Sequence, residues 1–154
     1  MTLPIAGVWD LECADWDRFV VGECLSLAGE RFVAWDPDEF ADWMLSREGV
    51  WYAHAGGRYD ALWLLDVCVR RGIGWTARLR GSGILSAKIG ELEVRDSFAI
   101  VPMSLAKAAP MGTSRKLDLS LPCTCGTPGC KGFCALTRIA DHGPTRAERA
   151  TVED

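Results

Sequence analysis

The stretch Val8-Trp9-Asp10-Leu11-Glu12-Cys13 follows a short apolar lead and guides the interpretation of the whole chain. We expect a buried strand over residues 3–10 that ends in two carboxylates. Because residues i and i+2 of a strand face the same side, Asp10 and Glu12 should project together. Two ionised carboxylates this close repel each other unless a cation lies between them, and Mg²⁺ or Mn²⁺ suits such oxygen ligands. The alternative is a solvated strand end.

Length and composition indicate one globular domain. The chain has 154 residues, nearly half of them apolar and seven of them Trp, which is enough for a substantial core. No stretch approaches the roughly 20 apolar residues of a membrane span, so we expect no membrane partner. The N-terminus lacks the pattern of a signal peptide, and we expect a cytoplasmic protein.

Charge is divided unevenly along the chain. Residues 1–60 carry 12 acids and 4 bases, a net charge of −8. Residues 61–154 carry 9 acids and 13 bases, a net charge of +4. An acidic first part is suited to holding metal ions, and a basic second part is suited to facing a polyanion. Ordinary surface variation is the other interpretation.

The first part of the chain predicts an antiparallel meander followed by a helix. Strands are expected at residues 3–10, 19–26 and 30–35, joined by short turns. Asp36-Pro37-Asp38-Glu39 has the pattern of a helix start, with Asp36 as the N-cap. The helix should run to about Arg47 and bury three side chains at helical spacing, those of Phe40, Trp43 and Met44.

The rest of the chain predicts a parallel strand and further helices. Residues 50–54 read as a parallel core strand, and residues 59–71 as a helix that ends at Gly72. Its inner face should carry Leu62, Leu65, Cys68 and Val69. A hairpin of residues 84–87 and 91–96 and a short helix at 102–109 follow. This order predicts a single α/β domain with a mixed β-sheet and flanking helices.

A third carboxylate stands where a strand passes into a helix. The segment His54-Ala55-Gly56-Gly57-Arg58-Tyr59-Asp60 should place Asp60 in the first helical turn, at the carboxyl end of the sheet. A parallel strand beside the first would bring Asp60 near Asp10 and Glu12. Gly56 and Gly57 would let a substrate backbone approach closely. Alternatively, Asp60 only interacts favourably with the helix N-terminus.

Three ordered segments resemble one enzyme family. Asp10-Leu11-Glu12 and the segment from His54 to Asp60 are similar to the first two motifs of DEDD (ribonuclease H-like) 3′–5′ exonucleases. They are most similar to the proofreading domain of family B DNA polymerases, especially the protein-primed phage and plasmid type. Asp96-Ser97-Phe98, followed by Pro102-Met103-Ser104-Leu105-Ala106-Lys107, resembles that family's Asp-Ser-Leu segment. The resemblance implies a ribonuclease H-like exonuclease fold.

The resemblance implies a cofactor and a set of catalytic carboxylates. In this family four carboxylates hold two divalent ions, Mg²⁺ or Mn²⁺, around the scissile phosphate. Asp10, Glu12 and Asp60 match three of them. Asp154, the last residue, is the candidate for the fourth, and a frayed terminus is the alternative. The family's Tyr four positions earlier, which orients the attacking water, is replaced by Ala150.

The resemblance also implies contacts with a single-stranded DNA 3′ end. The matching positions are His54, Tyr59, Ser97 and Phe98. Phe98 replaces a Leu and could stack on a base, whereas Ala55 replaces an Asn that contacts the primer strand. Lys116 resembles the catalytic-site lysine of the protein-primed subgroup, and a solvated lysine is the alternative.

Four cysteines lie close together in the C-terminal part. Turn residues surround them, and their thiolates predict a tetrahedral structural Zn²⁺ site, formed by Cys123, Cys125, Cys130 and Cys134. Free or redox-paired thiols are the other interpretation. We therefore expect an exonuclease-like core at residues 1–120, a zinc-binding insertion at 121–140, and the start of an incomplete C-terminal helix at 141–154.

Two classes of function remain open at this point. The first is a metal-dependent 3′–5′ exonuclease domain of a phage- or plasmid-borne replication protein, partnered by a polymerase domain or subunit. Whether the chain is a fragment, a stand-alone exonuclease or one piece of a split gene is left open. The second class is a catalytically degenerate module that binds single-stranded nucleic acid through the same fold and a zinc knuckle. An inactive fragment with neither property is a third interpretation.

Overall fold

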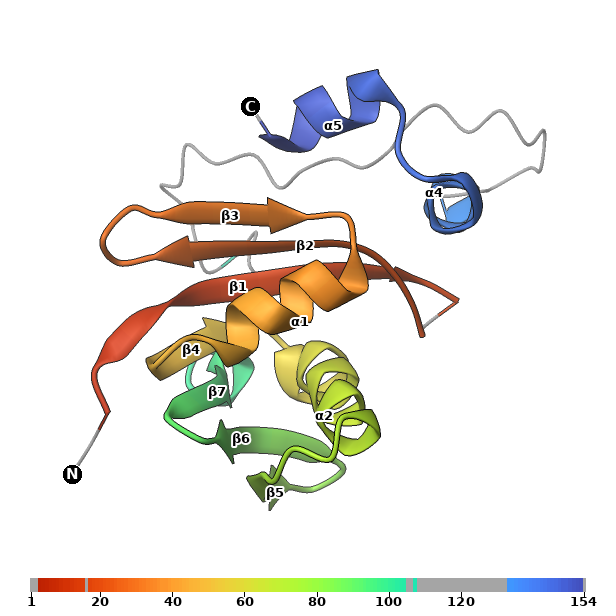
Figure 1. Ribbon diagram of the computed structural model, residues 1–154. Coiled ribbons are helices and arrows are strands. Elements are labelled where there is room, and N and C mark those ends of the chain that lie inside the picture. The colour runs from red at the N-terminus through yellow and green to blue at the C-terminus, as the bar shows by residue number, and fades with distance from the viewer. Residues whose placement is uncertain (1–2, 16, 105–106, 108–132, 154) are drawn as a thin grey trace.

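A seven-stranded sheet forms the centre of the protein (Figure 1). The computed structural model describes residues 3–15, 17–104, 107 and 133–153. The strands follow the spatial order β3-β2-β1-β4-β7-β6-β5. In chain order the elements are β1 (Ile5–Ala14), β2 (Arg18–Ser26), β3 (Arg31–Ala34), α1 (Pro37–Leu45), β4 (Gly49–Ala53), η1 (Gly56–Arg58), α2 (Asp60–Arg70), β5 (Thr76–Arg80), β6 (Gly83–Ile89), β7 (Leu92–Asp96), η2 (Ser97–Ala99), α4 (Phe133–His142) and α5 (Arg146–Glu153).

The sheet is mixed, and its parallel part lies in the middle. β4 pairs in parallel with both β1 and β7, while every other neighbouring pair is antiparallel. Residues 50–54 were predicted to form a parallel core strand, and β4 confirms this. Since β1, β4 and β7 run in the same direction, their carboxyl ends meet at one edge of the sheet. This edge is called the carboxyl edge below.

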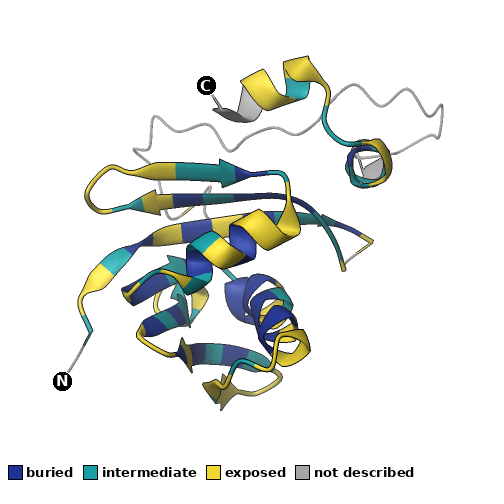
Figure 2. Ribbon diagram, viewed as in Figure 1, coloured by how far each residue is buried: buried dark blue, intermediate teal, exposed yellow. Residues whose placement is uncertain are grey.

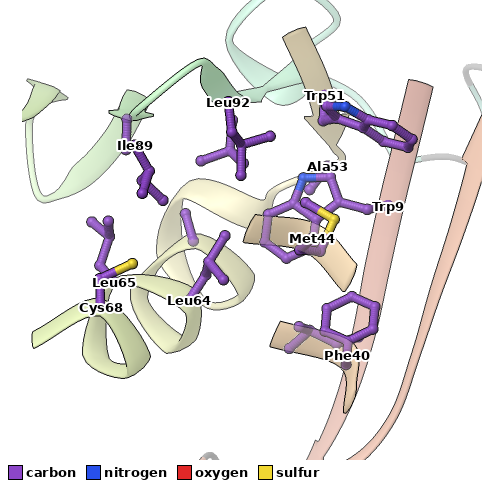
Figure 3. Packing of buried hydrophobic residues seen from close by; sticks show 14 of the residues in the cluster. Trp9, Phe40, Met44, Trp51, Ala53, Leu64, Leu65, Cys68, Ile89 and Leu92 are labelled. Carbon is purple, nitrogen blue, oxygen red and sulfur yellow. The ribbon is translucent and has the colours of Figure 1, made fainter. Parts of the chain in front are cut away.

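Two helices cover one face of the sheet and enclose the main core (Figures 1 and 3). Trp9 and Leu11 of β1 point into this core, whereas Val8 and Asp10 are exposed, as strand alternation requires. Phe40 and Met44 of α1 are fully buried against the sheet. The β1 strand is therefore held in place by its apolar side chains, which leaves its alternate residues at the surface (Figure 2).

Helix α1 begins as predicted. The Asp36 side chain accepts hydrogen bonds from the backbone N–H groups of Asp38 and Glu39, each 2.9 Å long. These bonds satisfy donors that the first helical turn leaves without a partner. Pro37 occupies the first helical position, where its missing N–H costs nothing.

The inner face of α2 differs from the prediction. Leu62 is 50% exposed and Val69 is 62% exposed, so neither belongs to the core. The buried stripe runs through residues spaced i, i+3, i+4 and i+7, namely Ala61, Leu64, Leu65 and Cys68. Starting the helix at Asp60 and orienting it by this stripe fixes the direction of the Asp60 side chain.

The last two helices lie beside the first strands of the sheet. Ile139 of α4 is buried in a small second cluster with Ala14, Val20 and Val21. α5 begins with a capping box: the Thr145 N–H donates to the Glu148 carboxylate, and the Glu148 N–H donates to the Thr145 hydroxyl. α4 begins at Phe133, so a helix occupies the end of the segment predicted as an insertion.

The predicted fold class, a mixed α/β sheet with flanking helices, is confirmed. Strand β5 was missed, because its sequence Thr76–Arg80 has only one half-buried residue and shows little apolar pattern. Of the expected helix at 102–109, residues 102–104 are not helical, and most of the rest lies outside the described residues. Within the described part of the chain, no helix is long and apolar enough to cross a membrane.

Candidate active site

Four carboxylates gather at the carboxyl edge. Asp10 and Glu12 stand in the second half of β1. Asp96 is the last residue of β7, and it pairs across the ladder with Ala53, the last residue of β4. Asp60 begins α2, seven residues after β4 ends. The predicted convergence of acids from distant parts of the chain therefore has its structural basis in three parallel strands.

Asp10 and Glu12 project from β1 on the side opposite the core. Asp10 is exposed and Glu12 half-buried, whereas Leu11 between them is buried. Beyond Glu12 the pairing with β2 shifts register, and such a bulge changes the direction of the following side chain. β1 thus delivers two neighbouring carboxylates that its own apolar residues hold in position.

The connection between β4 and α2 is unusually tight. Ala55 has a φ of 60°, a left-handed conformation that is unfavourable for alanine. A Cβ atom on Gly57 would lie 2.0 Å from the backbone oxygen of Ile84. A Cβ atom on Gly56 would lie 3.0 Å from an oxygen of Asp60. Only glycine permits this approach, and the approach brings Asp60 to the carboxyl edge.

Asp60 is a buried carboxylate with an unusual environment. It is only 6% exposed, and within the described part of the chain burial and neighbouring charges govern its ionisation. Burial raises the pKa of Asp60 most, and the pKa reaches about 8 instead of 3.8. Neighbouring charges add to this shift, in decreasing order those of Asp10, Glu12 and Asp96. In the absence of a cation, this carboxyl group is stabilised by retaining a proton.

Cys13 lies beside the same carboxylates. The pKa of its thiol is raised to about 11, mostly by burial and further by the charges of Asp60, Glu12 and Asp17. Its side chain is only half-buried, unlike those of Cys24 and Cys68. Cys24 and Cys68 are thus plain core thiols, whereas Cys13 borders the core and the acids. The thiol remains protonated at neutral pH and acts as a neutral neighbour of the acids.

The segment after β7 is tied to the end of β4 through His54. The His54 Nδ1 atom lies 3.1 Å from the Ser97 hydroxyl, and its Nε2 atom lies 2.8 Å from the Met103 carbonyl oxygen. The rings of His54 and Phe98 meet edge to face, with centroids 5.7 Å apart. Phe98 is still 40% exposed. Three of the residues expected to contact nucleic acid, His54, Ser97 and Phe98, therefore lie together.

Several expected site residues lie outside the described part of the chain. These are Asp154, Lys116 and three of the four cysteines, Cys123, Cys125 and Cys130. Cys134 belongs to α4, but its side chain is not described. Ala150, which stands where the resembled family has a Tyr, is exposed on α5.

The carboxylates do not form a preassembled ion cage. Among the described residues, no three His, Cys, Asp or Glu side chains already stand close enough to hold a metal ion. Like charges at the carboxyl edge repel one another, and a cation would be needed to draw them together. The donor set itself, oxygen atoms on a buried and an exposed carboxylate, is the type that hard divalent ions prefer.

Asp96 was not recognised as part of the acid group from sequence. It was noted only as the first residue of the Asp-Ser-Phe segment. The position of Asp96 at the end of a strand was an available signal, because strand ends meet at the same edge in parallel sheets. That signal required knowing that β7 pairs in parallel with β4, which local sequence does not reveal.

The fold and site define an α/β domain with a carboxylate-bearing edge, formed by three parallel strands. Among known proteins it is similar to part of phi29 DNA polymerase. The TM-score is 0.62 to the ternary complex with primer-template DNA and incoming nucleotides, at 15% identity over 96% of this chain and 28% of that one. It is 0.58 to the complex with single-stranded DNA, at 16% identity over 76% of this chain and 24% of that one.

The similarity has clear bounds. The chain spans about a quarter of the length of phi29 DNA polymerase, and at this identity the likeness concerns the fold. No protein-family model matches the sequence, and no curated protein matches it significantly.

Proposed function

We propose that this chain is a metal-dependent 3′–5′ exonuclease domain of the proofreading type, which hydrolyses phosphodiester bonds at DNA 3′ ends. The observation that carries the proposal is Asp60, a carboxylate that is 94% buried and has three other acids around it. This arrangement does not serve the stability of the fold, because buried like charges destabilise it. A divalent cation would turn this electrostatic cost into a favourable interaction.

The oxygen donors at the carboxyl edge are of the type that divalent ions such as Mg²⁺ or Mn²⁺ prefer, and the proposal requires the ions to draw these carboxylates together. Asp10, Glu12 and Asp60 would hold two such ions, and Asp154 would supply the fourth carboxylate. When bound, such ions lower the pKa of an attacking water and neutralise charge on the leaving 3′ oxygen. Lys116, outside the described residues, is proposed from the resemblance to act near the scissile phosphate. The protein itself orients the carboxylates, and the apolar residues of β1 and α2 keep them in place.

The substrate in this proposal is a single-stranded DNA 3′ end. Phe98 offers an exposed aromatic ring next to the carboxyl edge, and stacking on such a ring tolerates any base. Tyr59, 52% exposed at the start of α2, offers a second ring. The phi29 polymerase structures similar to this chain include complexes with single-stranded and with primer-template DNA, which supports a DNA substrate and a polymerase domain or subunit as partner.

A second candidate rests on one specific observation. Ala150 cannot provide the hydroxyl that a Tyr would provide at that position. If that hydroxyl is needed to orient the attacking water, the chain would bind single-stranded nucleic acid without cleaving it. A zinc knuckle formed by the four clustered cysteines would then contribute to binding.

The two candidates differ in a simple assay. A 5′-labelled single-stranded oligonucleotide is incubated with the protein and Mg²⁺ or Mn²⁺. The proposed exonuclease should shorten it stepwise from the 3′ end, and Asp10→Ala should abolish shortening. Asp66→Asn, which alters an exposed acid of α2 paired with Arg70, is the matched control and should retain activity.

Two outcomes would contradict the proposed activity. Binding of the oligonucleotide without any shortening would favour the degenerate binding module. Shortening that persists in Asp10→Ala would show that the activity comes from a contaminant or from another site.

A further inference from the structure

Most arginines in the described part of the chain are paired with acids, and a few are not. Seven form ion pairs with a carboxylate, namely Arg18, Arg31, Arg47, Arg70, Arg71, Arg95 and Arg138. Arg58, Arg78, Arg80 and Arg146 form no ion pair within the residues that the structure describes, and all four are exposed, whereas Arg149 lies over the ring of Trp35. Pairing is thus common in this protein, and three of these four arginines lie on η1 and β5.

Arg58 and Arg80 belong to segments that pack against each other. The Arg58 side chain passes Gly83, its Cγ lying 3.6 Å from where a Cβ on Gly83 would be. Arg80 pairs with Gly83 across the β5–β6 hairpin. The η1 turn is fixed to the same hairpin, because Gly57 packs against the Ile84 carbonyl oxygen. Arg58 and Arg80 therefore project from adjoining backbone segments at one corner of the domain.

This corner adjoins the exposed aromatic ring. The Arg80 Nη1 atom lies 3.5 Å from the carbonyl oxygen of Ala99 in η2. Phe98, the preceding residue, is held by a 2.8 Å hydrogen bond from its N–H to the Asp96 carboxylate. Gly83 thus links Arg58 to Arg80, and Ala99 links Arg80 to the segment that carries Phe98.

If the ligand of the acidic carboxyl edge is a polyanion, cationic side chains are needed beside the carboxylates. Carboxylates at the edge repel a phosphate backbone, whereas neighbouring cations attract it. Unpaired guanidinium groups bind phosphate without first having to break an ion pair, and Arg matches phosphate geometry well. Cations alternating with exposed aromatic rings are the pattern by which proteins bind single strands.

We propose that Arg58 and Arg80 form a phosphate-binding track, which together with Phe98 guides single-stranded DNA toward Asp60. The proposal deepens the proposed function and rests on it for the identity of the strand. It assigns a binding role to η1 and the β5–β6 hairpin. Phosphates lie along the two arginines, and a base stacks on Phe98. Arg78 lies further along β5 and is not required.

The test measures how binding depends on salt. A short oligothymidylate with a 5′ fluorescein is titrated with protein by fluorescence anisotropy, in Ca²⁺ and at several NaCl concentrations. The double variant Arg58→Ala/Arg80→Ala should bind roughly tenfold more weakly at low salt. Its plot of log affinity against log salt should be less steep by about 1.4, because each lost phosphate contact on a single strand removes about 0.7.

Two further variants make the result specific. Arg58→Lys/Arg80→Lys keeps both charges and should keep the steep slope. Arg70→Ala removes an exposed arginine of α2 that is paired with Asp66, and should bind as wild type does. Far-ultraviolet circular dichroism checks that the double alanine variant is folded. If that variant does not fold, the lysine variant still tests whether positive charge at positions 58 and 80 is enough for the salt dependence of binding.

The outcomes separate this inference from the exonuclease proposal. Binding that depends on Arg58 and Arg80 in a protein that never cleaves would support the track and refute the activity. Equal salt slopes in wild type and the folded double variant, or a lysine variant that loses the slope, would overturn the track. Either of these last two results could be obtained with a protein that still cleaves DNA, so neither would contradict the proposed exonuclease activity.

Discussion

At the scale of single residues, the proposed chemistry of this protein depends on the buried carboxylate of Asp60. An isolated carboxylate pays a desolvation cost when it is buried, and three neighbouring acids increase that cost. The fold tolerates this cost because α2 is anchored by its buried stripe from Ala61 to Cys68. Two predictions follow from the electrostatic position of Asp60, one for the metal-free protein and one for the protein with added cations.

The first prediction concerns pH. In EDTA, Asp60→Asn should be more stable than wild type at pH 8, and the difference should nearly vanish at pH 4. The folded pKa, about 8, lies above the ordinary 3.8. Below pH 3.8 Asp60 is protonated in both the folded and the unfolded state, so it does not lower the free energy of unfolding. As pH rises from 3.8 toward 8, only the unfolded chain ionises, and the free energy of unfolding of wild type falls. One pKa unit corresponds to about 1.4 kcal/mol, so several kcal/mol are at stake at pH 8.

Urea denaturation at a series of pH values measures this difference. Asp66→Asn is the control, because Asp66 is exposed in the same helix, and its effect should vary little with pH. A difference between Asp60→Asn and wild type that stays constant from pH 4 to 8 would contradict the raised pKa of Asp60.

The second prediction concerns metal binding. At neutral pH, Mn²⁺ should raise the Tm of wild type, because a ligand that binds only the folded state stabilises it. The shift should be strongly reduced in Asp60→Asn and in Asp10→Ala, which remove ligands. EDTA should reverse it. Differential scanning fluorimetry measures the shift, and an equal rise in wild type and both variants would argue against a site at the carboxyl edge.

At the scale of elements, the η1 turn determines where the site forms. It connects β4 to α2 through a left-handed Ala55 and two glycines that pack closely against β4 and β6. The same turn carries Arg58, so one short element positions both the buried acid and part of the proposed phosphate track. Changes in η1 should therefore affect stability and ligand binding together.

The third prediction tests this coupling. Gly57→Ala should lower the free energy of unfolding by about 1–3 kcal/mol, as overpacking does, because its Cβ would meet the Ile84 oxygen at 2.0 Å. The Mn²⁺-induced rise in Tm should also shrink, since η1 must move and Asp60 follows it. Denaturation and scanning fluorimetry measure both effects.

Gly74→Ala provides the matched control. Its Cβ would have no heavy atom within 4 Å, so stability should change by no more than about 0.5 kcal/mol and the metal response should be unchanged. A Gly57→Ala protein as stable and as responsive to Mn²⁺ as wild type would mean that η1 is freer to adjust than its contacts indicate.

At the scale of the whole molecule, the sheet joins the acidic and the basic parts of the chain. β1 and α2 supply the buried and exposed acids, whereas the β5–β6 hairpin from the second part supplies Arg80. In the strand order, β7 lies between β4 and β6. The acids of β1, α2 and β7 therefore lie at the carboxyl edge beside the β5–β6 hairpin, which carries Arg80. The uneven charge along the sequence thus becomes a local contrast in space.

The fourth prediction concerns the cysteine cluster, whose first three members lie outside the described residues. Protein purified in reductant should contain about one equivalent of zinc per chain. Cys125→Ser should lose most of it, whereas Cys68→Ser, at a buried core position, should retain it. Elemental analysis decides the matter, and less than half an equivalent in wild type would contradict a structural zinc site.

Much of the fold followed from local sequence. The strands at 19–26, 30–35 and 50–54 and the start of α1 were predicted within one or two residues, because alternation and capping are local signals. β5 was missed since edge strands bury little. The face of α2 was wrong at Leu62 and Val69, because two apolar stripes competed and only packing against the sheet decided between them.

The sequence by itself determined the acids Asp10, Glu12 and Asp60, the glycines of η1 and the alternation of apolar residues that makes a mixed sheet. Only the tertiary structure decided that β7 lies parallel to β4, and hence that Asp96 adds its charge to Asp60. It also brought Arg58 and Arg80 into one corner. The physical reason is that strand neighbours are set by burial summed over the whole sheet, which no short segment encodes.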